Sequence, residues 1–237
     1  MPHILIMLSG ATRMPLTDGR SRDIGFWPEE VIEPLGLFAR GGAQFTFATP
    51  DARPAAPEPS GLTPEGTGLS PERCHTLRQE VTALEGRLNT PAALRDLSSE
   101  PFDAVFIPGG YAPMVDLWAD PHGGRLLTDF HHRDKPIAAV CHGPAALLAC
   151  MASSGQWPFA GYRMTAFTDD EEHGVGLLST LPWTAQQALT KRGAHFLAAS
   201  QPWQTHVVED RNLFTGQNPA SAGPLAQRLL DRLTPSR

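Results

Sequence analysis

The 237-residue sequence has few cysteines and no long apolar run, and each absence excludes a class of protein. The three cysteines, Cys74, Cys141 and Cys150, are an odd number without CxxC spacing, which argues against a disulfide framework or a cysteine zinc site. No apolar stretch approaches the roughly 20 residues that cross a bilayer, so no membrane association is expected. The start of the chain, residues 1–8, lacks the cationic flank and cleavage site of a secretory signal. A protein of the reducing cytoplasm fits these features best.

Basic residues are also scarce. The sequence has 19 Lys and Arg against 25 Asp and Glu, a formal net charge of -6. No cluster of Lys and Arg forms the electrostatic stripe that nucleic-acid binding usually needs, so nucleic acid is not an expected partner. The length fits a single α/β domain with a sizeable core over residues 1–237.

Short apolar runs alternate with helical stretches, which is typical of a parallel sheet covered on both faces. The expected strands are residues 3–8, 44–48, 104–107, 136–140, 163–167 and 195–199. The expected helices are residues 29–40, 125–132, 144–151, 184–192 and 221–233. Near the C-terminus, residues 206–208 and 213–215 flank a polar turn and predict a hairpin attached to the sheet.

An insertion precedes the third expected strand. Residues 50–68 are rich in Pro, Gly and Ala and should be irregular. In residues 72–88, apolar side chains recur at helical spacing and predict an amphipathic helix. We expect a small helical cap around residues 50–98, which either roofs a pocket or covers a sheet edge.

Cys141 lies where an apolar strand runs straight into a helical pattern. A nucleophile on so sharp a turn needs small residues two places before and after it, and Ala139 and Gly143 meet that demand. Pro144 suits the first helical turn. The thiol should face the helix N-terminus, whose partial charge favours thiolate and whose amides can stabilise an oxyanion. The alternative is a small buried cysteine that ends a strand.

Residues 139–145, AVCHGPA, resemble the nucleophile motif of the class I glutamine-amidotransferase-like superfamily, which includes the PfpI-like proteases and the Parkinson-disease protein. The branch resembled contains small heat-shock chaperones and glutathione-independent glyoxalases (glyoxalase III). Further segments similar to this branch are residues 25–34, 107–110, 165–172, 201–203 and 215–222. The resemblance implies a flavodoxin-like three-layer sandwich with a mostly parallel sheet, helices on both faces and the small inserted helical cap.

The resemblance also assigns catalytic roles. It makes Cys141 the nucleophile, His142 and Glu172 the other triad members, and Glu30 a carboxyl group that points toward the cysteine. A carboxylate beside a thiolate is unfavourable, so Glu30 should be protonated or relay protons. Glu172 would orient His142 and fix its tautomer. Without the resemblance, Glu30 would be an ordinary helix N-terminal carboxylate and Glu172 part of an acidic surface loop.

The substrate and oxyanion contacts are expected at Gly110, Tyr111 and Gly143. The branch usually has His-Gly after its two glycines, whereas this chain has Tyr111-Ala112, so the substrate preference stays open. Tyr111 either donates a hydrogen bond into the pocket or serves as a packing residue.

The function implied by the resemblance is an enzyme for small reactive aldehydes, either a glyoxalase that converts methylglyoxal to lactate or a related deglycase. No cofactor or metal is expected, and a homodimer is expected by analogy alone. A stress-response chaperone or cysteine redox sensor is the main alternative. An amidase or peptidase is a further one, although residues 206–209 are one residue longer than the late His-x-Glu segment of the amidotransferases.

Overall fold

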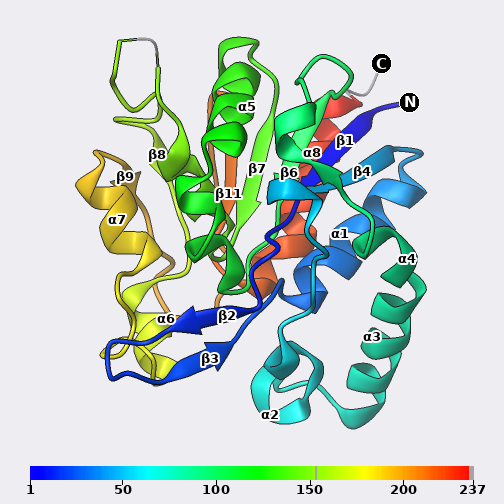
Figure 1. The fold of residues 1–237 in the computed structure, drawn as a ribbon, viewed down its shortest axis with the longest axis vertical. Helices are drawn as coiled ribbons and strands as arrows, with labels where there is room; N and C mark the ends of the chain where they lie inside the picture. The colour runs from blue at the N-terminus through cyan, green and yellow to red at the C-terminus, as the bar shows by residue number, and fades with distance from the viewer. Residues whose placement is uncertain (153, 235–237) are drawn as a thin grey trace.

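The computed structural model describes residues 1–152 and 154–234, and a seven-stranded sheet forms its centre (Figure 1). Neighbouring strands are parallel except for the C-terminal hairpin at one edge. The α/β class with a mostly parallel sheet and surrounding helices is therefore confirmed. The strands lie in the order β10 (Val207–Asp210), β11 (Leu213–Gly216), β7 (Ile137–Val140), β6 (Ala104–Ile107), β1 (His3–Met7), β4 (Gln44–Thr49) and β5 (Ala92–Ala93).

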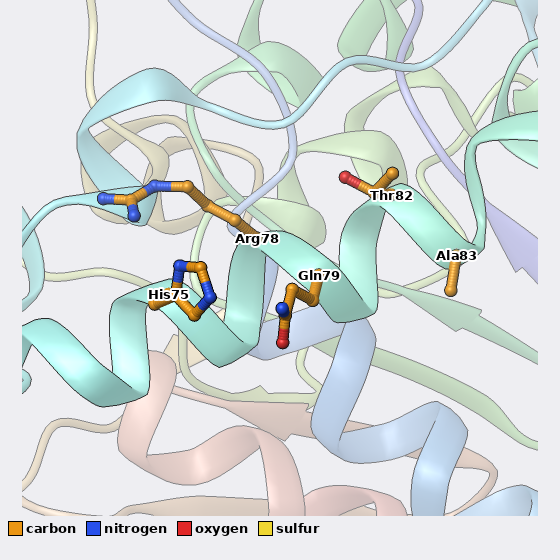
Figure 2. A pocket seen from close by; sticks show the side chains of 5 residues that line it. All are labelled: His75, Arg78, Gln79, Thr82 and Ala83. Atoms are coloured by element: carbon orange, nitrogen blue, oxygen red, sulfur yellow. The ribbon is translucent and has the colours of Figure 1, made fainter.

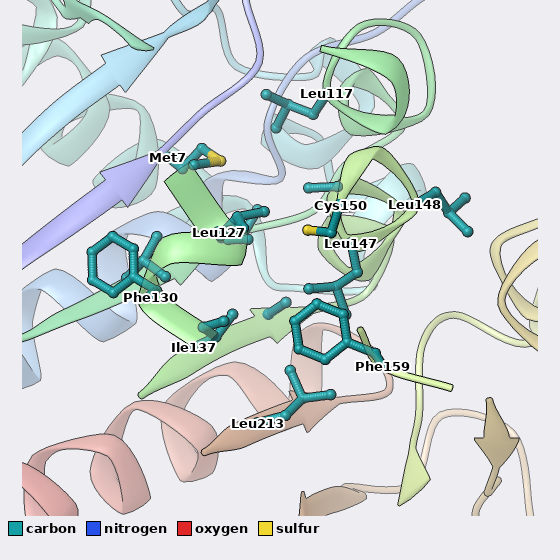
Figure 3. Close-up of a cluster of buried hydrophobic side chains, with 14 of the residues drawn as sticks. Met7, Leu117, Leu127, Phe130, Ile137, Leu147, Leu148, Cys150, Phe159 and Leu213 are labelled. Carbon is teal, nitrogen blue, oxygen red and sulfur yellow. The ribbon is translucent and has the colours of Figure 1, made fainter. Parts of the chain in front are cut away.

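Helices cover both faces of the sheet because alternate side chains of its strands enter two different cores. In β1, Leu5 and Met7 belong to one core, and Ile4 and Ile6 belong to the other. Figure 3 shows the first core, where Leu127, Phe130 and Leu147 surround Ile137. The helices over the first core are α5 (Pro121–His132) and the 3₁₀ helix η6 (Gly143–Ala149), and those over the second are α1 (Pro28–Arg40) and α8 (Ala222–Leu233).

The predicted strands at 163–167 and 195–199 were wrong in extent and in pairing. They shorten to β8 (Arg163–Met164) and β9 (His195–Phe196), which pair with each other outside the main sheet. Strand β8 ends at Met164 because the backbone amides that follow donate hydrogen bonds to groups outside a strand ladder. The Thr165 amide donates to the Thr215 hydroxyl at 2.9 Å, and the Phe167 amide donates to the Cys141 carbonyl at 2.9 Å. The predicted C-terminal hairpin is confirmed as β10 and β11.

Two helices also differ from the prediction. Helix α5 begins four residues early because the Asp120 carboxylate caps the Gly123 amide at 2.6 Å and Pro121 fits the first turn. The helix expected at 144–151 is the 3₁₀ helix η6. Close backbone packing at both of its ends restrains it, because Gly143 lies against β6 and Ala149 against Gly124. A 3₁₀ helix rises about 2.0 Å per residue and so covers more length between fixed ends than an α-helix.

The cap segment leaves the sheet between β4 and β6 and lies on the opposite side of the molecule from α7 (Ala185–Lys191) and β9 (Figure 1). Its main helix starts where the Ser70 hydroxyl accepts a hydrogen bond from the Arg73 amide. Helices within the cap are α2 (Pro64–Thr67), α3 (Pro71–Ala83) and α4 (Glu85–Leu88), so the single helix predicted over 72–88 is interrupted at Leu84.

Three further elements complete the fold. The sequence did not predict the hairpin of β2 (Arg13–Pro15) and β3 (Ser21–Asp23), whose side chains are largely polar and exposed. Helix α6 (Asp169–Gly174) follows β8 and contributes to the candidate site. Within residues 1–152 and 154–234, none of the helices combines the length and apolar composition needed to cross a bilayer.

Candidate active site

Cys141 follows β7 directly and adopts a left-handed backbone conformation, with φ of 60°. This conformation costs free energy in a residue with a side chain, so the surroundings must hold it. The Cys141 amide donates to the Gly216 carbonyl of β11 at 2.9 Å, and the Cys141 carbonyl accepts from the Phe167 amide. The nucleophile candidate is therefore held by two segments that follow it in the sequence.

The glycine turn after β6 lies close against this elbow. A side-chain carbon added at Gly109 would lie 2.7 Å from Cys141 Cβ, a distance that requires atoms to shift. Gly110 has φ of +79°, and a carbon added there would collide with the Gly25 carbonyl oxygen. Only glycine fits both positions.

Three side chains form a buried chain of contacts from the thiol inward. Cys141 Sγ lies 3.4 Å from His142 Nδ1, and His142 Nε2 lies 2.7 Å from Glu172 Oε1. His142 is 2% exposed and Glu172 is 0% exposed. An ionised carboxylate only accepts hydrogen bonds, so Nε2 carries the imidazole proton and Nδ1 faces the thiol as an acceptor. The structure thus brings together the predicted triad residues.

Tyr111 supplies the second hydrogen bond to the Glu172 carboxylate. Its hydroxyl donates to Glu172 Oε2 at 2.6 Å, so each carboxylate oxygen accepts one hydrogen bond. The Tyr111 ring packs 4.3 Å from the His142 ring, centroid to centroid. Burial, followed by the charge of Glu172, raises the pKa of Tyr111 far above its ordinary value, so the phenol keeps its proton.

Glu30 approaches the cysteine from the first turn of α1. Its Oε2 accepts a hydrogen bond from the Gly109 amide at 2.7 Å, and among the described residues the buried Oε1 has no hydrogen-bond partner. Burial raises the pKa of Glu30 from 4.5 to about 8, although the Gly109 amide and the Cys141 thiol oppose this shift. Glu30 is therefore mostly protonated at neutral pH.

The expectation of a lowered thiol pKa was wrong. Cys141 is 4% exposed, and burial, followed by the nearby Glu30 carboxyl, raises the pKa of the thiol above its ordinary value. The Gly110 amide opposes this shift without reversing it. The helix-terminus argument failed because it ignored both the burial and the carboxyl group. The thiol therefore needs a base to remove its proton.

Sequence reasoning missed Glu171, which is a structural carboxylate next to the catalytic candidate. Glu171 Oε1 accepts hydrogen bonds from the Trp203 amide at 2.9 Å and from the side chains of Gln217 at 3.0 Å and Asn218 at 2.8 Å. Its Oε2 accepts from the Thr168 amide and hydroxyl, and the Glu171 amide donates back to the Thr168 hydroxyl oxygen, which completes a capping box at the start of α6. The T-x-x-E spacing of this box was the signal present in the sequence. Glu171 ties α6 to two segments near the C-terminus.

Glu58 and Arg22 were also missed, because they lie in the cap and in the unpredicted hairpin. Glu58 is fully buried and accepts hydrogen bonds from the Tyr111 amide and from Arg22 Nη2, both at 3.1 Å. The Arg22 guanidinium lies over the Tyr111 ring, 5.3 Å from its centroid. Together they hold Tyr111 in place.

A cavity of about 830 Å³ opens above the cysteine. Its wall contains Cys141, His142, Gly110 and Tyr111, and residues of the cap segment form one side. The lining also contains carboxylates and two exposed apolar residues, Val175 and Trp203. The lining residues that come from the cap are Ser60, Thr63, Glu65, Gly66 and Thr67. The cap therefore lines one side of the pocket through residues 60–67, and the helix predicted over 72–88 supplies no lining residue.

A second depression lies on the exposed face of α3, lined by His75, Arg78, Gln79, Thr82 and Ala83. Figure 2 shows these side chains projecting from a single helix. All five residues are exposed, and none has the enclosed surroundings that activate a catalytic group. Within the described part of the chain, no three His, Cys, Asp or Glu side chains are grouped so that they could hold a metal ion.

Comparisons with known proteins agree with this arrangement. A model of the DJ-1/PfpI family matches residues 25–169. The chain is 37% identical over 141 residues to the glutamine amidotransferase-like class 1 domain-containing protein 1 of Bos taurus, a match that covers 60% of this chain and 64% of that protein, less than two thirds of its length. It is 28% identical over 225 residues to the protein/nucleic acid deglycase HchA of Pseudomonas aeruginosa, with 90% of this chain and 74% of the relative covered. Its fold is similar to the structure described as glyoxalase III from Candida albicans, with a TM-score of 0.81 and 22% identity over 97% of this chain and 96% of the other.

Proposed function

The chain belongs to the DJ-1/PfpI family, and on this premise we propose that it is a cysteine-dependent enzyme acting on small reactive aldehydes. The observation that carries the proposal is the Cys141 thiol at the wall of a cavity, with His142 Nδ1 3.4 Å away and the Glu30 carboxyl beside it. The deglycase name of a relative that matches 90% of this chain supports the same class of chemistry. The specific reaction proposed is the conversion of methylglyoxal to lactate without glutathione.

The first step is addition of the sulfur to the aldehyde carbon. The thiol is protonated at neutral pH because its pKa is raised, so His142 Nδ1 accepts the proton as the S–C bond forms. Glu172 stabilises the imidazolium through Nε2. The proton then passes to the former carbonyl oxygen, which gives a hemithioacetal. We assign transient stabilisation of that oxygen to the amides of Gly110 and Gly143.

The second step moves hydrogen within the bound substrate. Ionised Glu30 removes the proton from the sulfur-bearing carbon, and the electron pair forms an enediol with the neighbouring carbonyl carbon. Return of the proton to that neighbouring carbon, with transfer of the hydroxyl proton from the oxygen of the sulfur-bearing carbon to the former ketone oxygen, gives the thioester of a hydroxy acid. Water then attacks the thioester, the C–S bond breaks, and Cys141 recovers its proton. The net change is addition of one water molecule to methylglyoxal, with no external oxidant or reductant.

The decisive test is an assay of the purified protein with methylglyoxal and with glyoxal, in the absence of glutathione. We expect the unmodified protein to form lactate and glycolate, and Cys141→Ala to form neither. Cys150→Ala is a matched control because Cys150 is also buried but packs in the other hydrophobic core and does not line the cavity. An inert unmodified protein, or a Cys141→Ala variant as active as the control, contradicts the proposal.

The redox-sensor alternative receives less support from the site. Oxidation begins from the thiolate, and the raised pKa of Cys141 leaves little thiolate at neutral pH. An amidase would use the same nucleophile and the same His142 base. Parallel assays with small amides therefore belong in the first experiment.

A further inference from the structure

We propose that Tyr111 is a positioning residue that acts through Glu172 to hold the orientation and tautomer of His142, and that its hydroxyl does not serve the substrate. The structure differs here from both sequence-based expectations for Tyr111, which were donation into the pocket and simple packing. The kinetic part of this inference rests on the proposed function, and the thiol-reactivity part does not.

The hydroxyl is already committed to a buried carboxylate. Tyr111 donates to Glu172 Oε2 at 2.6 Å, and His142 Nε2 occupies Oε1 at 2.7 Å. A carboxylate held by a donor on each oxygen cannot rotate without losing one of them. Because the phenol has one proton and gives it to Glu172, it has none left to donate to a substrate.

This arrangement determines which imidazole nitrogen carries the proton. Tyr111 keeps Glu172 an acceptor, and an acceptor facing Nε2 requires the hydrogen on that nitrogen. Nδ1 is then unprotonated and lies 3.4 Å from the thiol, as the transfer of the thiol proton demands. If Glu172 Oε2 lost its donor, the carboxylate could turn away from Nε2, and Nδ1 could then carry the hydrogen.

Aromatic packing restrains the same imidazole. The Tyr111 ring lies 4.3 Å from the His142 ring at an interplanar angle of 34°, and the Phe167 ring lies 4.7 Å away at 38°. Packing of this kind restrains the plane of the imidazole, whereas the hydroxyl controls the carboxylate. The two contributions of Tyr111 can be separated experimentally, because phenylalanine keeps the ring and removes only the hydroxyl.

Tyr111 is itself held independently of any substrate. Its amide donates to buried Glu58, the Arg22 guanidinium lies over its ring, and its side chain is mostly enclosed. A residue braced from two further segments and bonded to Glu172 at its tip has little freedom to turn toward a ligand.

The test compares Tyr111→Phe with Tyr162→Phe, the only other tyrosine in the chain. Tyr162 also has a buried ring, and its hydroxyl lies 3.5 Å from His131 Nδ1, a residue outside the cavity lining. Thermal unfolding of both variants first verifies that they are folded. The first measurement is the rate of iodoacetamide alkylation at Cys141 against pH, resolved by mass spectrometry of the peptide. The second is the ¹⁵N spectrum of the imidazoles, with His142→Asn used to assign the signal.

We expect Tyr111→Phe to raise the apparent pKa of Cys141 alkylation by about one unit, because an Nδ1 that carries the hydrogen no longer accepts the thiol proton. The His142 signal should change from a single Nε2–H tautomer to a mixture. In aldehyde turnover, kcat should fall about tenfold with KM unchanged, as expected for loss of one bond to a charged group. Tyr162→Phe should match the unmodified protein.

Two results overturn the inference. A higher KM with unchanged kcat and an unchanged alkylation profile would make Tyr111 a substrate contact. Identical tautomer and alkylation profiles in Tyr111→Phe and the unmodified protein would make it a packing residue alone. If the unmodified protein does not turn over aldehydes, the proposed function fails, and the alkylation and imidazole measurements still decide the role of Tyr111.

Discussion

Replacing Glu30 with glutamine should change how the stability of the protein depends on pH. The folded protein raises the pKa of Glu30 from 4.5 to about 8, mainly through burial. The folded state therefore holds this proton more tightly than the unfolded state. The corresponding contribution to stability is fully present below about pH 4.5 and is lost as the pH rises through about 8. Glutamine cannot ionise, so Glu30→Gln should not show this loss.

The size of the effect follows from the shift. A difference of about 3.5 units at about 1.4 kcal/mol per unit corresponds to a loss on the order of 5 kcal/mol by pH 9. The amide oxygen of the introduced glutamine can still accept the hydrogen bond from Gly109, so the variant should remain folded. Titrating groups distant from Glu30 are the same in both proteins and cancel in the difference between them, so the difference reports Glu30 together with the Cys141 thiol whose pKa it raises.

Urea denaturation at pH 5, 7 and 9 measures this difference. The free energy of unfolding of the unmodified protein should fall relative to Glu30→Gln across the series. Glu33→Gln provides the control, since Glu33 is an exposed carboxylate on the same helix. If unmodified protein and Glu30→Gln give parallel curves from pH 5 to 9, Glu30 titrates normally and the relay assigned to it has no physical basis.

The contacts of Glu30, Gly109 and Glu171 give three further predictions. The kcat/KM for methylglyoxal should rise with pH toward about 8, as Glu30 ionises. Glu30→Gln should lower kcat by at least about a hundredfold, because the variant lacks this base. Initial rates measured over the pH range test both expectations. Gly109→Ala should lose about 1–3 kcal/mol of stability and most activity, because the added carbon lies 2.7 Å from Cys141 Cβ; urea titration and the aldehyde assay measure this loss. Glu171→Ala should lose about 3 kcal/mol or more, because five donors lose their acceptor in a buried site, and thermal unfolding should show a lower Tm; an unchanged Tm would contradict the structural role.

The sheet could be predicted from the sequence because its strands are short apolar runs with both faces buried. The four residues of β6, and likewise those of β7, are all buried, so their sequences contain little but apolar side chains. The β2–β3 hairpin lacks this signal, since its residues are mostly polar and exposed. The β8 strand was predicted too long because the apolar run does not show where the Thr165 amide bonds, which is to Thr215 instead of to a neighbouring strand.

The candidate site could be predicted only as a set of residues. Local spacing identified the turn at Cys141, and the family resemblance pointed to Glu30 and Glu172. Contacts between distant segments, such as Tyr111 to Glu172, leave no local pattern that a single sequence reveals. The pKa of Cys141 was mispredicted for the same reason, since the burial and the Glu30 carboxyl that raise it come from elsewhere in the fold.

The left-handed backbone at Cys141 also has a consequence for biosynthesis. Its amide is held by the carbonyl of Gly216, 75 positions further along the chain, and its carbonyl by the amide of Phe167. Until these downstream residues have left the ribosome, the nascent chain lacks the two hydrogen bonds that hold Cys141 in this conformation. We therefore expect the sulfur to acquire its working geometry only late in synthesis, when β11 docks beside β7.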